Sequence, residues 1–377
     1  MRVKLVCVAG GRPNFPKLAA LFRALSTRPE RFETCFVHTG QHSDPRMSKL
    51  FCEELGLPAP SVDLGVGSAT HAVQVAEVMR RFEAVLQSEQ PQGVVVAGDL
   101  NSTLACALAT SKFFRDEPFL FQGKPRRRPV LAHLEAGLRS YDDDMPEEIN
   151  RRVTDCLSDL LFVSEPSGET NLRREGVAPE RHHLVGNVMI DTLLHLKERA
   201  SRSEVLARLG LEPRSYALLT LHRPNNVDDE RQLRTLLDTL DEIAIELPVV
   251  FPVHPRTRAR LEAARIRPRS DRFLLTEPLG YLDFVKLEAS AKVVLTDSGG
   301  VQDETTVLGV PCITLRNNTE RPITVTEGTN VLGHTTREGI LGAYAALRSE
   351  PRSGRVPRSW DGNAAERVAR VLEQVFS

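Results

Sequence analysis

Short apolar runs alternate with amphipathic stretches along almost the whole chain. Runs such as residues 3–8, 94–96 and 130–133 contain few polar side chains and have the length of buried strands. Between these runs, apolar residues recur every three to four positions, as in residues 15–25, and this spacing predicts helices. Strands that alternate with helices predict a mostly parallel sheet with helices on both faces.

The alternation pauses once, in a predicted helix with a polar tail over residues 190–214. Because 377 residues exceed what one compact core usually holds, we place a domain boundary in this segment. The prediction is an α/β protein with two Rossmann-like, doubly wound domains, residues 1–190 and 191–363, and a final amphipathic helix over residues 364–377. Ligands of doubly wound domains bind beyond the carboxyl ends of the strands, so we expect the site in a cleft between the two domains.

The composition excludes several classes of protein. Charged residues make up 26% and the formal net charge is −1, which argues against a nucleic-acid partner and against a disordered tail. The six cysteines form no CxxC pair and several lie in apolar runs, so we expect small buried hydrophobic residues in a reducing compartment. The N-terminus is typical of a strand rather than a signal peptide, and no apolar run approaches the ~20 residues of a membrane helix. We therefore predict a soluble, cytoplasmic protein with no membrane partner.

A glycine-containing turn follows the predicted strand at residues 293–296. Asp297 and Ser298 are typical of turns and helix N-caps, and Gly299 and Gly300 let the backbone approach a ligand closely. The free N–H groups and the dipole of the helix that follows favour an anion. Glu304 lies in the first turn of that helix, where a carboxylate can accept hydrogen bonds from a ribose. The turn therefore predicts a site for a nucleoside diphosphate; an ordinary strand-to-helix turn is the alternative.

Two cationic side chains follow the first predicted strand, beyond the turn at Gly10 and Gly11. Arg12 offers a guanidinium that can bind a pyrophosphate through two N–H groups, and Lys17 adds a point charge one turn into the helix. Surface charge is the alternative for each residue. Their position at a strand-to-helix turn favours anion binding.

Acidic side chains follow other predicted strands. Asp99 comes directly after Gly98, Glu135 lies two residues past a strand, and Glu147 and Glu148 open a helix. A helix N-cap is the alternative for Asp99, and compensation of the helix dipole is the alternative for the two glutamates. When several acids converge on one cleft, their pKa values differ from one another, as proton transfer in both directions requires.

The second half adds polar residues at strand ends. His222 follows a buried strand and can donate to a phosphate or a leaving group, and His254 repeats that arrangement; a structural role is the alternative for both. Arg321 follows the strand after the Gly-Gly helix and can reach a phosphate. Residues 113–128 form a predicted basic loop, either a solvated insertion or a binding patch. The sequence has no zinc-ligand spacing, no GxSxG, no Walker loop and no GxGxxG.

Together these blocks resemble the nonhydrolysing UDP-N-acetylglucosamine 2-epimerase family. The resemblance extends from Gly10 to about Gly333. It is carried by eight blocks in the family's order: Arg12-Pro13-Asn14-Phe15-Pro16-Lys17, Thr39-Gly40-Gln41-His42, Gly98-Asp99, His133-Leu134-Glu135-Ala136-Gly137-Leu138-Arg139, Met145-Pro146-Glu147-Glu148-Ile149-Asn150-Arg151, Leu221-His222-Arg223-Pro224, Asp297-Ser298-Gly299-Gly300 and Thr319-Glu320-Arg321-Pro322.

The resemblance implies a fold of the glycosyltransferase-B type, in which the last helix crosses back to the first domain. It also implies the positions that bind substrate, and no metal or other cofactor. By resemblance, UDP lies mainly on the second domain, with phosphate at Ser298, Gly299 and Gly300 and ribose at Glu304. The resemblance places uracil between Phe284 and the backbone near Leu279. It implies further diphosphate contacts from Arg12, His222 and Arg321. The implied catalytic acids are Asp99, Glu135 and Glu147, and the implied cationic helpers are Lys17 and His222.

The reaction implied is inversion at C2 of the sugar, an isomerase activity that interconverts UDP-GlcNAc and UDP-ManNAc. UDP is eliminated to a 2-acetamidoglucal and is then added back. The resemblance further implies a homodimer and a role in cell-surface polysaccharide synthesis. Ser43 and Asp44 replace the pattern of the allosteric site found in some members, so we expect no activation by substrate. The alternatives are an epimerase of a related sugar such as a diacetamido-uronic acid, a hydrolysing 2-epimerase, a glycosyltransferase and a nucleotide-sugar sensor.

Overall fold

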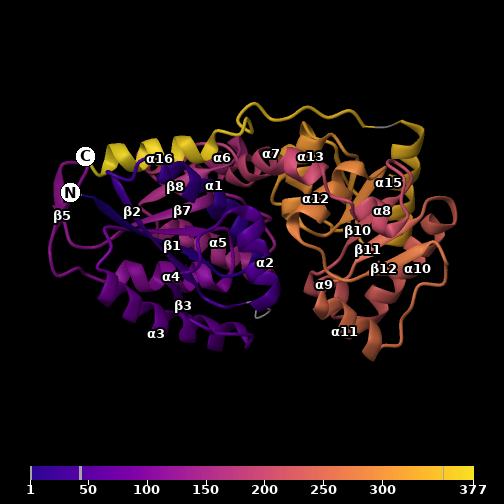
Figure 1. Cartoon of the computed structure of the whole chain (residues 1–377), viewed down its shortest axis with the longest axis horizontal. Helices are drawn as coiled ribbons and strands as arrows, with labels where there is room; N and C mark the ends of the chain where they lie inside the picture. The colour runs from indigo at the N-terminus through magenta and orange to yellow at the C-terminus, as the bar shows by residue number, and fades with distance from the viewer. Residues whose placement is uncertain (1, 42–44, 351) are drawn as a thin grey trace. The chain divides into compact units, whose positions relative to one another are not determined.

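The computed structural model describes residues 2–41, 45–350 and 352–377. The chain forms two compact units (Figure 1). Unit 1 contains Met1–His195 and Arg358–Ser377, and unit 2 contains Leu196–Pro357. The division falls inside one helix, α7 (Val188–Ser201), close to the position at which the apolar pattern pauses.

Unit 1 is built on a seven-stranded parallel sheet in the order β3-β2-β1-β4-β7-β8-β9. The order reverses between β1 and β4, which makes the carboxyl ends of these two strands a switch point where ligands usually bind. The strands are β1 (Val3–Ala9), β2 (Phe32–His38), β3 (Val62–Asp63), β4 (Gly93–Ala97), β7 (Val130–Ala136), β8 (Leu160–Val163) and β9 (His182–Leu184).

Helices cover both faces of this sheet, with α3 and α4 on one face and α1 and α16 on the other (Figure 1). The first face buries Val78, Phe82 and Cys106 against the strands. The helical segments of unit 1 are η1 (Arg12–Asn14), α1 (Phe15–Ser26), α2 (Pro45–Leu55), α3 (His71–Glu89), α4 (Asn101–Lys112), α5 (Pro146–Leu157), α6 (Pro166–Arg174), η2 (Pro179–Arg181), most of α7, and α16 (Ala364–Val375).

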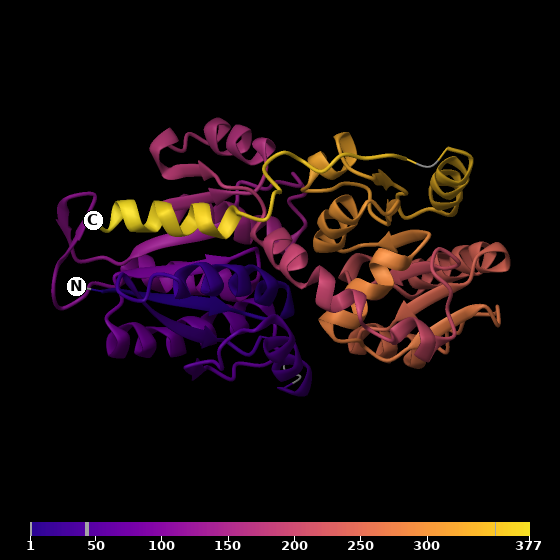
Figure 2. The same ribbon diagram turned by 45° about the horizontal axis from the view of Figure 1, so that its top comes forward.

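The C-terminal helix α16 packs on α1, so the end of the chain belongs to unit 1 (Figure 2). Val368, Leu372 and Val375 are buried on one side of α16, as the amphipathic pattern predicts. Arg28 of the segment after α1 forms an ion pair with Glu366. The helix therefore completes the hydrophobic core of unit 1.

Residues 113–128 are not the loop that the sequence predicts. They contain an antiparallel hairpin of β5 (Phe119–Phe121) and β6 (Lys124–Arg126). Gln122 and Gly123 connect the two strands with φ of 50° and 72°, and positive φ at both positions is the requirement of a tight hairpin turn. Arg126 and Arg128 both form ion pairs with Asp159. Much of the basic charge in this segment is therefore engaged within unit 1.

Unit 2 is built on a six-stranded parallel sheet in the order β12-β11-β10-β13-β14-β15. Thr220 and Thr296 are register partners at the ends of β10 and β13, so the turns after these strands are neighbours. The strands are β10 (Ala217–Thr220), β11 (Val249–Pro252), β12 (Phe273–Thr276), β13 (Val293–Thr296), β14 (Cys312–Thr314) and β15 (Asn330–Leu332).

Successive residues of these strands point to two separate cores. Leu219 and Leu295 are buried toward α10, whereas Leu218 and Val294 are buried toward α12 and α13. The helices are α8 (Val205–Leu209), α9 (Pro224–Val227), α10 (Glu230–Glu246), α11 (Pro255–Ala263), α12 (Tyr281–Ser290), α13 (Gly299–Leu308), α14 (Pro322–Thr326) and α15 (Arg337–Ser349).

The structure bears on two expectations drawn from the composition, one about the cysteines and one about membrane helices. Five of the six cysteines are buried, whereas Cys156 is exposed at the end of α5 and is not the small buried residue that we expected. Over the described part of the chain, we find no helix that is both long and apolar enough to cross a membrane.

Candidate functional site

In unit 2, Asp297 joins the turns after β10 and β13. Its buried carboxylate accepts hydrogen bonds from the backbone N–H groups of His222 (3.0 Å) and Arg223 (2.9 Å) and from the Asn226 amide (3.2 Å). The ring Nδ1 of His222 lies 2.9 Å from the same carboxylate. Burial alone raises the pKa of Asp297, but His222 and the two N–H groups lower it to about 2. Asp297 therefore fixes the orientation of His222, whose other ring nitrogen, Nε2, is the one available to a ligand.

Gly299 opens helix α13 beneath the side chain of Arg321. A Cβ at this position would lie 2.2 Å from Arg321 Nη1 and 2.7 Å from Glu320 Oε1, so glycine is required by close approach. Arg321 is buried, donates from Nε to Asp303 at 2.9 Å, and also forms an ion pair with Glu320. The structure thus brings an arginine to the N-terminus of a helix that begins Gly299-Gly300 after Ser298 as its N-cap. A guanidinium next to free helical N–H groups is suited to a diphosphate.

The second turn of α13, and not the first as the sequence predicts, carries a buried carboxylic acid, Glu304. Tyr281, the first residue of α12, donates its hydroxyl to Glu304 at 2.9 Å. Burial raises the pKa of Glu304 to about 7; the Tyr281 hydrogen bond opposes this rise and the Asp303 charge adds to it. Leu279 and Phe284, which flank uracil by resemblance, pack at the edge of the apolar cluster that contains Val301 of α13. The predicted nucleotide residues of unit 2 therefore lie around α12 and α13.

In unit 1, Lys17 and Glu135 form a buried ion pair that joins α1 to the end of β7. The turn after β4 touches this pair: a Cβ built on Gly98 would lie 2.8 Å from Lys17 Nζ and 3.4 Å from Glu135 Oε2. Glu135 has a φ of 71°, and the pairing of β7 with β8 is irregular between Leu134 and Ala136. A positive φ at a residue other than glycine is strained, and such strain is frequent at functional sites. It turns the carboxylate toward α1.

Asp99 lies on the same turn and forms an ion pair with Arg151 of α5. Helix α4 begins at Asn101 with Leu100 as its N-cap, so the alternative that Asp99 caps this helix is wrong. Arg151 is buried and also pairs with Glu148 at 2.6 Å. The turn residues Gly98 and Asp99 thus contact the Lys17–Glu135 pair on one side and α5 on the other.

The two glutamates that open α5 differ in their surroundings. Glu148 is buried and accepts hydrogen bonds from the Ser140 N–H (3.0 Å) and hydroxyl (3.0 Å) as well as from Arg151. Burial raises the pKa of Glu148, but the Ser140 and Arg151 hydrogen bonds lower it below its usual value. Glu148 therefore holds the loop before α5, whereas Glu147 is half-buried and lies in the first turn of that helix.

The remaining predicted residues have different outcomes. Arg12 is half-buried in η1, with its guanidinium carbon 5.8 Å from the centre of the Phe51 ring. His254 accepts a hydrogen bond from the Arg256 N–H and caps α11, which is its structural alternative. Gln41 accepts from the Ser102 N–H at 3.0 Å. The prediction about allostery concerns Ser43 and Asp44, which lie outside the described residues, and it stays a prediction.

Sequence reasoning missed the partners of these residues. It did not identify Tyr281, Arg151 or His133, whose Nε2 lies 2.8 Å from the Gly98 carbonyl. Each contacts a residue far away in the sequence: Arg151 and Asp99 are 52 positions apart, Tyr281 and Glu304 are 23 apart, and His133 and Gly98 are 35 apart. His133 and Arg151 did lie within the blocks on which the resemblance rests. Their place in those blocks was the only available signal.

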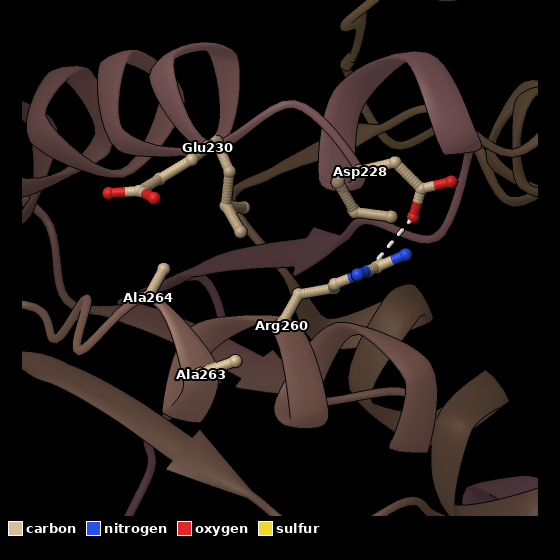
Figure 3. A pocket seen from close by; sticks show the side chains of 7 residues that line it. Asp228, Glu230, Arg260, Ala263 and Ala264 are labelled. Atoms are coloured by element: carbon tan, nitrogen blue, oxygen red, sulfur yellow. Dashed lines mark hydrogen bonds and ion pairs between the residues drawn. The ribbon is translucent and has the colours of Figure 1, made fainter.

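A hollow of about 200 Å³ lies in unit 2 beside the start of α10 and the end of α11 (Figure 3). Asp228 and Arg260 face each other in it and form a hydrogen bond of 3.2 Å. Its lining residues include none of the predicted site residues. Among residues 2–41, 45–350 and 352–377, no group of three histidines, cysteines or acids is arranged to hold a metal ion.

Comparison with known proteins decides the family. The family model described as UDP-N-acetylglucosamine 2-epimerase matches residues 23–373. The chain belongs to the UDP-N-acetylglucosamine 2-epimerase family. Among its relatives, the UDP-N-acetylglucosamine 2-epimerase of Methanocaldococcus jannaschii is 40% identical over 379 residues, which cover 98% of this chain and 99% of the relative. The UDP-2,3-diacetamido-2,3-dideoxy-D-glucuronate 2-epimerase of Pseudomonas aeruginosa is 36% identical, over 99% of this chain and all of the relative.

Solved structures of family members have the same fold. The crystal structure of the M. jannaschii UDP-GlcNAc 2-epimerase in complex with UDP-GlcNAc and UDP has a TM-score of 0.90 and 39% identity, covering 98% of this chain and 99% of that chain. A structure of a putative UDP-N-acetylglucosamine 2-epimerase from Listeria monocytogenes has a TM-score of 0.86 and 30% identity, covering 100% of this chain and 97% of that chain. The predicted fold class, two Rossmann-like parts of the glycosyltransferase-B type, is confirmed.

Proposed function

We propose that this chain interconverts UDP-GlcNAc and UDP-ManNAc by inverting C2 of the sugar. The observation that carries the proposal is the buried Lys17–Glu135 pair, held against the Gly98–Asp99 turn at the switch point of a doubly wound sheet. A strained carboxylate that pairs with an ammonium group, against a turn that carries a second carboxylate, is equipped to move protons rather than to stabilise a fold. Membership of the epimerase family supports the same activity.

Unit 2 would bind the nucleotide. The N-terminus of α13 and the buried Arg321 supply N–H groups and positive charge for the diphosphate, and His222, whose Nδ1 lies against Asp297, presents Nε2 as a further polar contact. Glu304 would accept hydrogen bonds from the ribose hydroxyls, as acids near nucleotide-binding turns do. The bond that breaks joins the sugar to the diphosphate, so these donors also stabilise the charge on departing UDP.

Unit 1 would exchange the proton. A carboxylate takes the proton from C2, the bond from C1 to the UDP oxygen breaks, and a double bond forms between C1 and C2. In the return step the UDP oxygen attacks C1 and a proton is delivered to the opposite face of C2. Asp99, Glu135 and Glu147 are the candidate acids and bases, with Lys17 and His222 as cationic helpers. The steps contain no net oxidation, so they need no redox cofactor.

A second candidate is epimerisation of a related UDP-2-acetamido sugar. It is favoured by the P. aeruginosa relative, which is named for a 2,3-diacetamido uronic acid and is 36% identical to this chain. The chemistry at C2 is the same for both sugars, and only the groups at C3 and C6 differ. The homodimer, the cytoplasmic location and the role in polysaccharide synthesis stay predictions.

The test is to incubate the purified protein separately with UDP-GlcNAc and with the diacetamido-uronate nucleotide and to follow the products by proton NMR. We expect UDP-ManNAc to appear from UDP-GlcNAc, with no net release of UDP. Free ManNAc together with UDP would instead identify a hydrolysing 2-epimerase. Turnover of only the uronate would favour the second candidate, and turnover of neither nucleotide would contradict the proposal.

A further inference from the structure

His133 lies beneath the acidic turn and has a hydrogen-bond partner at each ring nitrogen. The residue is fully buried in β7. Its Nδ1 lies 2.7 Å from a carboxylate oxygen of Asp155, and its Nε2 lies 2.8 Å from the backbone carbonyl of Gly98. A backbone carbonyl can only accept, so Nε2 carries a proton and donates it to Gly98.

The surroundings of His133 are charged and hold its ring in place. Asp155 of α5 also accepts from Arg139 (2.7 Å) and from the Gly137 N–H (3.0 Å), and these contacts keep it ionised. Arg139 in turn forms a second ion pair with Glu175 at 2.7 Å. The Arg139 guanidinium thus pairs with two carboxylates beside His133, and buried charges that are paired and hydrogen-bonded in this way are tolerated in a protein interior.

The Gly98 carbonyl is one of several points at which the acidic turn is fixed. The Gly98 N–H donates to the Leu134 carbonyl at 3.0 Å, and the Asn150 amide donates to the Asp99 carbonyl at 2.9 Å. Gly98 has a φ of 65°, so other orientations of this peptide are accessible to it. Without His133, the buried Gly98 carbonyl would lose this donor, and the peptide group between Gly98 and Asp99 would be free to rotate.

We propose that His133 is a positioning residue for catalysis. Its Nε2–H donates to the Gly98 carbonyl and thereby fixes both Asp99 and the Gly98 backbone, which lies against the Lys17–Glu135 pair. His133 does not touch the reacting atoms. It acts through the turn, while the contact between Nδ1 and Asp155 anchors the ring to α5. This inference rests on the proposed function only in the claim that the turn takes part in catalysis.

Two substitutions distinguish the two hydrogen bonds that the His133 ring forms, one with Asp155 and one with Gly98. His133→Asn places its amide near the position of Nδ1, so it keeps a donor for Asp155 and loses the bond to Gly98. His133→Gln places its amide near the position of Nε2, so it keeps a donor for Gly98 and weakens the link to Asp155. We expect His133→Asn to lower kcat about 100-fold with KM within two-fold, because a small misplacement of a reacting group has an effect of that size. We expect His133→Gln to stay within about five-fold of the unchanged enzyme.

Hydrogen exchange of the peptide that contains residues 97–101 gives a readout that is independent of substrate. His133→Asn should exchange faster than the unchanged protein, and His133→Gln should exchange at nearly the same rate. Equal losses of kcat in the two variants, a loss through KM alone, or unchanged exchange in His133→Asn would overturn the proposal. If the unchanged protein lacks epimerase activity, the proposed function fails, while the exchange experiment still decides whether His133 holds the turn.

A third variant keeps the test decisive if His133→Asn does not fold, as judged by its thermal unfolding. Asn150→Ala removes the donor to the Asp99 carbonyl and leaves the His133 ring in place. It should also lower kcat by at least ten-fold with KM within two-fold, because it frees the same turn from its other side. Full activity of Asn150→Ala would show that the position of the turn does not limit catalysis and would overturn the proposal.

Discussion

The ammonium group of Lys17 and the carboxylate of Glu135 form an ion pair inside unit 1, although the two residues are 118 positions apart in the sequence. Both side chains are almost completely buried, and the Gly98 backbone lies against them. A pair of this kind costs desolvation energy and is a weak contributor to stability. Its position at the switch point of the sheet, together with the positive φ of Glu135, supports the proposal that the pair takes part in catalysis.

The first prediction concerns Glu135. Glu135→Gln removes the negative charge and the basic site while keeping the shape, so we expect kcat to fall by about 10²–10⁴-fold, the usual range for an acid or base in catalysis. Steady-state kinetics with UDP-GlcNAc measure the effect. Glu180→Gln, an exposed acid in η2, is the matched control and should keep full activity. A Glu135→Gln enzyme with more than half of the original kcat would remove Glu135 from the mechanism.

The second prediction concerns the close approach of Gly299 and Arg321. Gly299→Ala would force the Arg321 guanidinium to move, because the added Cβ would lie 2.2 Å from it. Loss of one charge-assisted hydrogen bond corresponds to about 1.5–3 kcal/mol, so we expect UDP to bind at least ten-fold more weakly by isothermal titration calorimetry. Gly342→Ala is the control, since nothing lies within 4 Å of a Cβ built there. Unchanged UDP affinity in Gly299→Ala would place the diphosphate elsewhere.

The third prediction concerns the pH dependence of nucleotide binding. Burial raises the pKa of Glu304 to about 7, so the carboxylate that we propose for ribose binding is fully formed only above that pH. Between pH 8 and pH 6 the ionised fraction falls about ten-fold, and we expect UDP affinity to fall by up to the same factor. Comparison with Glu304→Gln isolates this contribution, because the titration of UDP itself is common to both proteins. Parallel pH profiles for the two proteins would contradict the assignment of Glu304 to the ribose.

The fourth prediction concerns stability and a second buried acid, Glu288 of α12. Neither of its carboxylate oxygens has a hydrogen-bond partner among the described residues. Burial raises its pKa well above the usual value, and the neighbouring Glu304 raises it further. Between its ordinary pKa in the unfolded chain and its raised pKa in the folded state, only the folded chain keeps the proton. The free energy of unfolding should therefore decrease as pH rises, by about 1.4 kcal/mol per pH unit.

Urea unfolding from pH 5.5 to pH 7.5 measures this dependence. Glu304 contributes in the same direction up to about pH 7, so the relevant quantity is the difference between the unchanged protein and Glu288→Gln. We expect Glu288→Gln to be less sensitive to pH and more stable near pH 7.5. Glu262→Gln, on the exposed side of α11, should leave the pH profile unchanged. A profile for Glu288→Gln that is parallel to that of the unchanged protein would show that Glu288 is not held protonated.

The fold was largely predictable because the apolar runs are long and regular. Strand β1 has seven residues of which only Lys4 is polar, and β7 begins with three apolar residues, Val130, Leu131 and Ala132. We did not predict the two-residue strand β3 or the three-residue strand β15, because segments this short show no periodic pattern of apolar residues. The hairpin at residues 119–126 was missed because the positive φ of Gln122 could not be anticipated from a glutamine.

The site was predictable only in part. Strand-to-helix turns identify residues such as Asp99 and Gly299 directly, because their positions follow from the order of strands. Their partners do not follow in this way: Arg151, Tyr281 and His133 were found only when the structure brought distant segments together. Electrostatic properties such as the raised pKa of Glu304 depend on burial, which the sequence pattern does not supply.

The central claim is that acids of unit 1 remove and return the proton at C2 of the sugar. Incubation with UDP-GlcNAc in deuterium oxide, followed by proton NMR, tests it most directly. We predict that deuterium enters C2 of both UDP-GlcNAc and UDP-ManNAc and that Glu135→Gln slows this exchange together with turnover. Formation of UDP-ManNAc with the original C2 proton retained, or the absence of exchange at C2 in every UDP-2-acetamido sugar that is turned over, would contradict it.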